Sequence, residues 1–296
     1  MADLSYDIKP VRELRDVIEE TAATWELAPG TTFEQTTCEG VDCVWIDAES
    51  DQNRSDAVYL HVHGGGYYRG SARVDAAVCS FVVAGSGVRC LSVNYRRPPD
   101  EGVFPAAVDD VYTVWRWLTS PSGGNIAADK VVVGGTSAGG GLCLALLLKI
   151  RDEGEQLPAG AIPVSPWTDM TQSGESFKTN AEHGPAREYL AHWGQVYLDG
   201  ADPKTPYASP LFGDLQGLPP TLIQVGGNET MLDDATGFAA RAARAGCQVT
   251  LEVYAGQGHS FQHHAATSDV AREAVDRMAA FVARRIEPGK SQEVSR

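Results

Sequence analysis

A serine flanked by very small residues stands at the junction of two apolar segments. Residues 130–134 form a short β-branched run, and the string GTSAG at 135–139 leads from this run into an apolar helical pattern. A serine held on a sharp strand-to-helix turn has strained backbone angles, so side chains two positions to either side must be tiny. Gly135 and Gly139 meet that requirement. The junction therefore predicts an α/β sheet with Ser137 presented at the end of a strand.

The rest of the chain alternates between strand and helix patterns. Many strand candidates are apolar throughout, as in strands covered on both faces, and this predicts a mainly parallel sheet flanked by helices in a single domain over residues 1–296. The candidate strands are Val41–Ala48, Ala57–His63, Val88–Asn94, Lys130–Gly134, Gly160–Ser165, Thr221–Val225 and Gln248–Tyr254. The candidate helices are Val74–Ala84, Ala106–Leu118, Ala138–Arg151, Met231–Ala245 and Thr267–Arg285.

Two segments fall outside this alternation. Residues 10–27 have the pattern of an amphipathic helix, and residues 170–210 are polar, rich in Gly, Pro and aromatic residues, with a helix expected from Ala186 to Leu198. We expect a cap over the sheet, formed by about residues 1–35 and 170–210. The tail at 287–296 is expected to be disordered.

Charge and cysteine usage restrict the partners. The formal net charge of -15 argues against nucleic acids and anionic membranes, and mildly against a highly anionic substrate. The N-terminus lacks a secretory signal pattern, and no apolar run reaches membrane-spanning length. Six scattered cysteines lack metal-ligand spacing. We expect a cytoplasmic protein with reduced thiols, no metal and no cofactor.

A second glycine motif, HGGG at 63–66, ends another apolar strand. Consecutive glycines let backbone N–H groups approach a developing oxyanion, and Gly65, Gly66 and Ala138 are the expected donors. A phosphate-binding loop is the alternative, but its GxGxxG or Lys-Ser/Thr signatures are absent. A metal pair at His61 and His63 lacks third and fourth ligands. We expect His63 to hold the glycine loop by hydrogen bonding.

A serine nucleophile needs a base, and in this fold the base follows the last strand. His259 stands in the loop directly after the strand that ends at Tyr254. His263 and His264 are rivals, but they fall in what reads as the start of the terminal helix. His259 is therefore the predicted base.

The base needs an orienting carboxylate after an earlier strand. Glu229 is the first acidic residue after the strand Thr221–Val225 and is the preferred candidate. Asp233 lies one helical turn further on and faces the same side of the helix, and Asp234 is a third candidate.

Aromatic residues suggest the walls of a substrate pocket. Tyr67 and Tyr68 follow the glycine loop, while Tyr189, His192 and Trp193 lie on the proposed cap helix. They are expected to line an apolar pocket for a short acyl group or a compact cyclic ester. Packing within the cap is an equal alternative for each of them.

Taken together, the motifs resemble the hormone-sensitive-lipase family of α/β-hydrolases, especially its bacterial esterases. The resemblance covers about residues 40 to 285. The motifs that carry it are HGGG at 63–66, GTSAGG at 135–140, NYR at 94–96, FPAAVDD at 104–110, SPWTD at 165–169 and GHSF at 258–261. The GTSAG string is similar to the subfamily that includes monoterpene ε-lactone hydrolase-like proteins and short-chain acyl esterases.

The resemblance implies an eight-stranded sheet, a helical cap and the oxyanion roles of Gly65, Gly66 and Ala138. Homodimers are common in this family, so the resemblance also suggests one. The chain departs from the family pattern twice. Glu229-Thr-Met replaces Asp-Pro-Leu at the acid position, and YRRPPD at 95–100 replaces YRLAPE, a change expected to affect substrate entry or local packing.

The sequence thus predicts a serine carboxylic-ester hydrolase that acts on short-chain acyl esters or compact lactones through an acyl-enzyme. Its catalytic residues would be Ser137, His259 and Glu229. An amidase or acyltransferase with the same triad is the first alternative, because the fold does not fix the leaving group or acceptor. A non-catalytic small-molecule receptor on this fold is disfavoured by the presence of His259.

Overall fold

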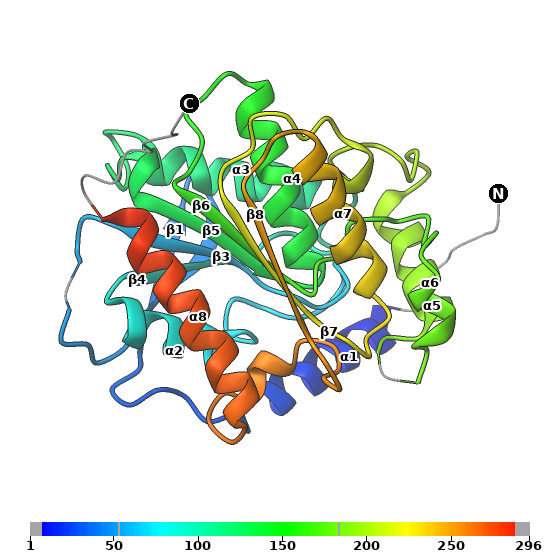
Figure 1. Ribbon diagram of the computed structural model, residues 1–296, viewed down its shortest axis with the longest axis horizontal. Coiled ribbons are helices and arrows are strands. Elements are labelled where there is room, and N and C mark those ends of the chain that lie inside the picture. Colours follow the sequence, from blue (N-terminus) through cyan, green and yellow to red (C-terminus); the bar gives the residue numbers. More distant parts are fainter. Residues whose placement is uncertain (1–7, 53, 183, 288–296) are drawn as a thin grey trace.

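One mixed sheet forms the centre of the protein. The computed structural model describes residues 8–52, 54–182 and 184–287, and within them eight strands pair in the order β1-β2-β4-β3-β5-β6-β7-β8 (Figure 1). The β1–β2 and β2–β4 pairs are antiparallel and the remaining pairs are parallel, which confirms the α/β-hydrolase fold. The strands are β1 Thr32–Cys38, β2 Val41–Asp47, β3 Val58–Val62, β4 Arg89–Val93, β5 Val131–Thr136, β6 Gly160–Val164, β7 Thr221–Gly226 and β8 Val249–Tyr254.

Helices cover both faces of the sheet. α2 (Ala76–Ser86) and α8 (Asp269–Ile286) pack together on one face, and α3 (Ala106–Thr119), α4 (Ala138–Asp152) and α7 (Leu232–Arg244) lie on the other (Figure 1). The strand β3 is buried throughout because Leu60 faces the α3–α4 side while Tyr59 faces the α2–α8 side. This two-sided burial explains why the central strands are apolar without alternation.

Strand β1 is the element that the apolar-run criterion missed. Its sequence TFEQTTC is largely polar and exposed because it forms an edge of the sheet. It pairs with β2 through a hairpin turn at Glu39 and Gly40, both with positive φ. The predicted cap segment 1–35 therefore extends too far, since residues 32–35 belong to the sheet.

Two segments meet above the carboxyl ends of the parallel strands. α1 (Ile8–Ala22) and α6 (Arg187–Leu198) come together where Val11 packs with Tyr68, Trp193 and Val196. The short α5 (Ser176–Thr179) precedes α6, while residues 1–7 and most of the predicted tail lie outside the described residues.

The departure from the family pattern at 95–100 packs against α1. Arg15 donates from Nη2 to Asp100 Oδ1 at 2.9 Å and from Nε to the carbonyl oxygen of Tyr68 at 2.8 Å. Its side chain is nearly buried, so these bonds fix α1 to the loop that follows the glycine motif. Of the two roles predicted for this loop, local packing is the one that these contacts support.

Candidate active site

Ser137 stands on a strained turn between β5 and α4. Its backbone angles, φ 56° and ψ −116°, are unusual for a residue with a side chain. A methyl group at Gly135 would collide with the carbonyl oxygen of Gly139, and one at Gly139 would collide with that of Val62. The Ser137 amide donates to the carbonyl of Val164 at 2.8 Å, which ties the turn to β6. The close packing of this turn requires both glycines.

His259 is the histidine that reaches Ser137. Its Nε2 atom lies 2.9 Å from Ser137 Oγ, and its side chain is 16% exposed. His263 and His264 end a short 3-10 turn, and the terminal helix begins later, at Asp269, so they do not start that helix as the sequence suggested.

Of the three candidate carboxylates, Glu229 is the one that faces the histidine. Glu229 is fully buried, and its Oε2 atom lies 3.4 Å from His259 Nδ1. Asp233 and Asp234 instead accept hydrogen bonds from backbone amides within 168–176. The first-ranked sequence candidate therefore occupies the position that an orienting acid requires.

Ser165 joins the acid to the loop of the histidine. From the end of β6, its hydroxyl donates to Glu229 Oε2 at 2.7 Å and accepts from the Ser260 amide at 3.3 Å. Within the described residues, Glu229 Oε1 and His259 Nδ1 have no hydrogen-bond partner. Contacts between catalytic groups are often long without substrate and shorten when it binds. In the sequence, Ser165 belongs to the SPWTD motif at 165–169, which by itself indicates no role for its hydroxyl.

The glycine loop lines the space in front of Ser137. Gly65 and Gly66 have φ values of 121° and 63°, which favour glycine. Their amides donate no hydrogen bond to another described residue, so they are free to bind a ligand oxygen. Ala138 follows Ser137 as the first residue of α4, at the positive end of the helix dipole.

His63 fixes the shape of this loop. Its Nδ1 atom donates to the carbonyl oxygen of Gly64 at 2.7 Å, and its ring stacks on Tyr95 at a centroid distance of 4.3 Å. Burial lowers the pKa of His63 to about 4, so the ring is neutral near pH 7. It therefore makes the kind of hydrogen bond that the sequence led us to expect.

A second histidine–carboxylate cluster, which the sequence reading missed, lies next to the loop. Asp75 contacts His61 Nε2 at 2.7 Å and His263 Nε2 at 2.9 Å, and it accepts from the Gly64 amide at 3.3 Å. Burial opposes ionisation, but the hydrogen bonds from His263 and His61 hold the pKa of Asp75 well below its usual range. The described residues contain no group of three or more side chains suited to hold a metal.

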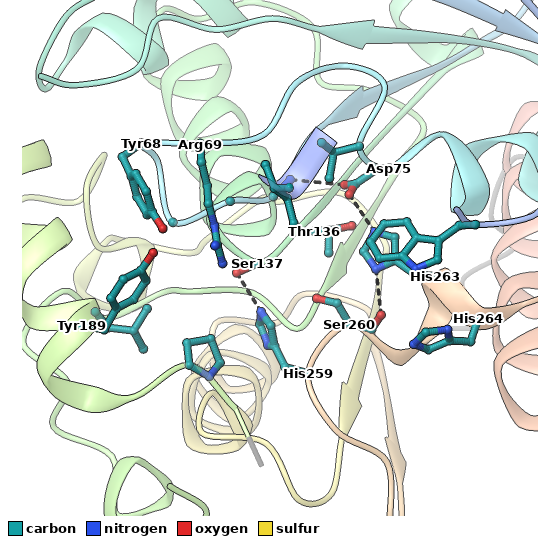
Figure 2. A pocket seen from close by; sticks show the side chains of 18 residues that line it. Tyr68, Arg69, Asp75, Thr136, Ser137, Tyr189, His259, Ser260, His263 and His264 are labelled. Carbon is teal, nitrogen blue, oxygen red and sulfur yellow. Dashed lines mark hydrogen bonds and ion pairs between the residues drawn. The ribbon is translucent and has the colours of Figure 1, made fainter. Parts of the chain in front are cut away.

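These residues surround a cavity of about 210 Å³ in front of Ser137 (Figure 2). Tyr68 and Tyr189 line it as predicted, but Tyr67 and Trp193 do not. Tyr67 is buried in the core and stacks on Tyr197 at 3.9 Å, because neighbouring residues on this turn point in opposite directions. Trp193 stacks behind Tyr68 at 3.6 Å. The sequence reading missed further lining residues: Ile18, Trp25, Arg69, Pro185, Leu190, His263 and His264.

The fold and this site define an α/β hydrolase, and comparison with known proteins narrows the class. A family model described as the alpha/beta hydrolase fold matches residues 59–263. A crystal structure of an esterase from the bacterial hormone-sensitive lipase family superposes with a TM-score of 0.89 at 38% identity, covering 96% of this chain and 94% of that one. The chain belongs to the hormone-sensitive-lipase family of α/β-hydrolases.

Other relatives are similar over nearly their whole length. An acetyl-hydrolase from Streptomyces hygroscopicus is 34% identical, with 93% of this chain and 90% of the relative covered. An esterase from Acinetobacter venetianus is 31% identical, with 90% and 87% covered. The structure of EstE5 soaked with p-nitrophenyl butyrate gives a TM-score of 0.88 at 35% identity and covers 97% of this chain and 94% of that one. No helix in the described part of the chain is long and apolar enough to cross a membrane.

Proposed function

We propose that the protein is a serine carboxylic-ester hydrolase that cleaves short-chain acyl esters or compact lactones through an acyl-enzyme. The observation that carries this proposal is the 2.9 Å contact between His259 Nε2 and Ser137 Oγ on the strained turn after β5. A nucleophile and a base within hydrogen-bond distance, backed by a buried carboxylate, are the requirements for acyl transfer.

In the first half of the reaction, Ser137 Oγ attacks the ester carbonyl and its proton passes to His259 Nε2. The carbonyl oxygen becomes an oxyanion beside Ser137, where the amides of Gly65, Gly66 and Ala138 act as donors. Such preorganised donors are worth about 3–4 kcal/mol each in other hydrolases. His259 then protonates the departing alcohol, which leaves the acyl group on Ser137.

In the second half, His259 takes a proton from water, and the hydroxide attacks the acyl-enzyme through a second oxyanion. Collapse returns the proton to Ser137 Oγ and releases the acid. Glu229 keeps the Nδ1 proton of His259 directed toward itself, so that Nε2 stays available as the acceptor. The 3.4 Å separation of Glu229 and His259 is a resting distance that must shorten as charge develops on the imidazole.

The dimensions of the cavity support small acyl groups. Its volume of about 210 Å³ lies below the range of roughly 300–1,000 Å³ typical of sites for drug-sized ligands. Tyr68, Tyr189 and Leu190 narrow it from the cap side. The acetyl-hydrolase name of one relative agrees with a short acyl group.

The experiment combines active-site labelling with a substrate series. Phenylmethylsulfonyl fluoride should modify the protein once, at Ser137, and Ser137→Ala should lower kcat for p-nitrophenyl acetate by at least about 10⁴-fold, since loss of a catalytic serine costs on the order of 10⁶ in other serine hydrolases. Ser122→Ala, at an exposed serine, serves as the control. Activity should peak at short chains in a p-nitrophenyl ester series.

Retained ester hydrolysis in Ser137→Ala would exclude the proposed nucleophile. Faster turnover of aryl amides than of aryl esters and lactones, measured side by side, would instead identify an amidase. A peak at long acyl chains would contradict the short-chain assignment.

A further inference from the structure

The wall of the cavity contains an arginine that has no counter-ion among the described residues. Arg69 lines the same pocket as Ser137, and Figure 2 shows its side chain extending from the glycine loop toward that serine. Its guanidinium makes no ion pair or hydrogen bond within the described residues, and its Nε atom is buried without a partner. The guanidinium lies near two aromatic rings, with Cζ 5.5 Å from the centroid of Tyr68 and 5.8 Å from that of Tyr189.

This isolation is unusual for an arginine that is half-buried. Buried charges are normally paired, and burial here lowers the pKa of Arg69. Arg15 and Arg97, which lie nearby in the fold, each reach a carboxylate, at 2.9 Å in Asp100 and 2.8 Å in Glu101. The chain has 39 acidic residues against 24 basic ones, so acidic partners are not scarce. Interactions with aromatic rings offset only part of the cost of burying a cation.

The position of Arg69 is also fixed relative to the reacting atoms. Its amide donates to the carbonyl oxygen of Gly65 at 3.2 Å, and a side chain at Gly65 would collide with the Arg69 carbonyl oxygen. Tyr68, the preceding residue, is held by Arg15 through its carbonyl oxygen and by stacking on Trp193. The arginine is thus built into the loop proposed to bind the oxyanion, and little ordering is needed when a ligand binds.

We propose that Arg69 binds a carboxylate on the substrate, so that the preferred esters carry an acidic group a few bonds from the scissile carbonyl. This inference rests on the proposed ester hydrolysis and adds a substrate class to it. The planar guanidinium can bind a carboxylate through two parallel hydrogen bonds. The hydroxyl of Tyr68, which is buried in the same wall and has no hydrogen-bond partner in the described part of the chain, supplies a further donor.

The negative net charge of the chain does not oppose this preference. Exposed charges are screened over about 8–10 Å at physiological ionic strength, whereas a half-buried cation in the wall of a small cavity is screened less and acts on the ligand at contact distance. The net charge of the whole chain mildly disfavours a highly anionic substrate, but this expectation does not extend to the local field of the pocket.

The test compares matched pairs of substrates. For the acyl side, the mono-p-nitrophenyl ester of glutarate is paired with p-nitrophenyl pentanoate. For the alcohol side, γ-acetoxybutyrate is paired with butyl acetate. Each is assayed with the unmodified enzyme, Arg69→Met, Arg69→Lys and the control Arg73→Met. Arg73 is an exposed arginine four positions away whose guanidinium lies over the ring of Phe33, outside the pocket.

In at least one pair, the unmodified enzyme should have a higher kcat/KM for the anionic ester than for the neutral one. Arg69→Met should lower the ratio of these two kcat/KM values by roughly 10- to 100-fold, mainly by raising KM for the anionic ester. Arg69→Lys should keep part of the ratio, and Arg73→Met should keep all of it. The pair that responds shows which side of the ester carries the carboxylate. An unchanged ratio in both pairs, or an equal fall for anionic and neutral esters, would overturn the proposal.

Binding separates this result from a failure of the proposed chemistry. Glutarate should raise the Tm of Ser137→Ala, and it should not raise that of the double variant with Arg69→Met. If no ester is hydrolysed and Ser137 is not labelled, the proposed function fails, yet the glutarate shift still decides whether Arg69 binds carboxylates. Equal shifts in the two proteins, or none in either, would refute the role of Arg69.

Discussion

Two clusters of histidine and carboxylate lie beside the same cavity, and they are built differently. In the first, His259 approaches Glu229 at 3.4 Å, and Glu229 Oε1 has no hydrogen-bond partner within the described residues. In the second, Asp75 lies between His61 and His263, and both of its oxygens are engaged at 2.7–2.9 Å. The residue types are the same. We call the Asp75–His61–His263 cluster saturated, because both carboxylate oxygens are bonded, and the Glu229–His259 cluster open, because one is not bonded to any described residue.

The difference separates a structural framework, at Asp75, from the group proposed to react, at His259 and Glu229. A buried carboxylate whose oxygens are all bonded is rigid, because any movement breaks a hydrogen bond in a low dielectric. An open pair can tighten as charge develops during a reaction. The framework also supports the reactive group, since His263 Nδ1 donates to the carbonyl oxygen of Ser260, the residue after His259. The Asp75 cluster thus anchors the loop that holds the proposed base.

The largest effect on activity is expected from a substitution in the open cluster. Glu229→Gln should lower kcat for p-nitrophenyl acetate by about 10²–10⁴-fold, because an amide can hold the histidine in the wrong tautomer, as in related triads. The Tm should change little, since one oxygen of Glu229 already lacks a hydrogen-bond partner among the residues that the structure describes. Steady-state kinetics and thermal unfolding measure the two effects.

Asp233→Asn is the matched control. Its carboxylate accepts from a backbone amide at 2.9 Å and does not face His259. We expect its kcat to stay within about threefold of the unmodified enzyme, as for substitutions outside the reacting groups. A large loss in Asp233→Asn together with an active Glu229→Gln would assign the acid to the other carboxylate.

A substitution in the saturated cluster should lower the stability of the fold. Asp75→Asn should reduce the free energy of unfolding by about 3–5 kcal/mol, because it leaves buried polar groups of His61 and His263 without their charged partner. Urea denaturation measures this loss, and Asp51→Asn, at an exposed aspartate, is the control. A loss below that of the control would show that the cluster does not stabilise the fold.

The difference in the free energy of unfolding between the unmodified protein and Asp75→Asn should depend on pH. The lowered pKa of Asp75 contributes stability above the unfolded value of about 4, and this contribution is lost as pH falls below it. Burial disfavours the His61 imidazolium, but the bond to Asp75 helps raise the pKa of His61 to about 10. That contribution is complete below the unfolded value of about 6.5 and is lost as pH rises toward 10. The stability gap should be widest between these limits, and a gap that stays constant up to pH 10 would contradict the charged pair.

The residues of the open cluster could be selected from the sequence because each lies in a recognisable local pattern. Ser137 sits on a turn whose small neighbours are close in sequence, and His259 and Glu229 each follow a strand at the edge where parallel strands end. Burial on both faces made the central strands apolar and therefore visible. Strand β1 was missed because an exposed edge strand needs no apolar run.

Long-range partners made the saturated cluster invisible in the sequence. Asp75 and His263 are 188 positions apart, and no motif links them. The directions of neighbouring side chains were equally hidden, since Tyr67 points into the core while Tyr68 and Arg69 line the cavity. The isolation of Arg69 became apparent only when the neighbours of its side chain were known.

The smallest effect is expected at Ser165, where the framework meets the open cluster. Removing its hydroxyl takes one hydrogen bond from Glu229 Oε2 and one acceptor from the Ser260 amide. Hydrogen bonds to charged groups contribute about 1.5–3 kcal/mol, so Ser165→Ala should lower kcat by roughly 10- to 100-fold. Ser165 has a φ of 45°, so Ser165→Gly tests whether the backbone conformation matters. Equal losses in the two variants would assign the effect to the hydroxyl as a positioning group, and full activity in Ser165→Gly would show that the hydroxyl does not position Glu229.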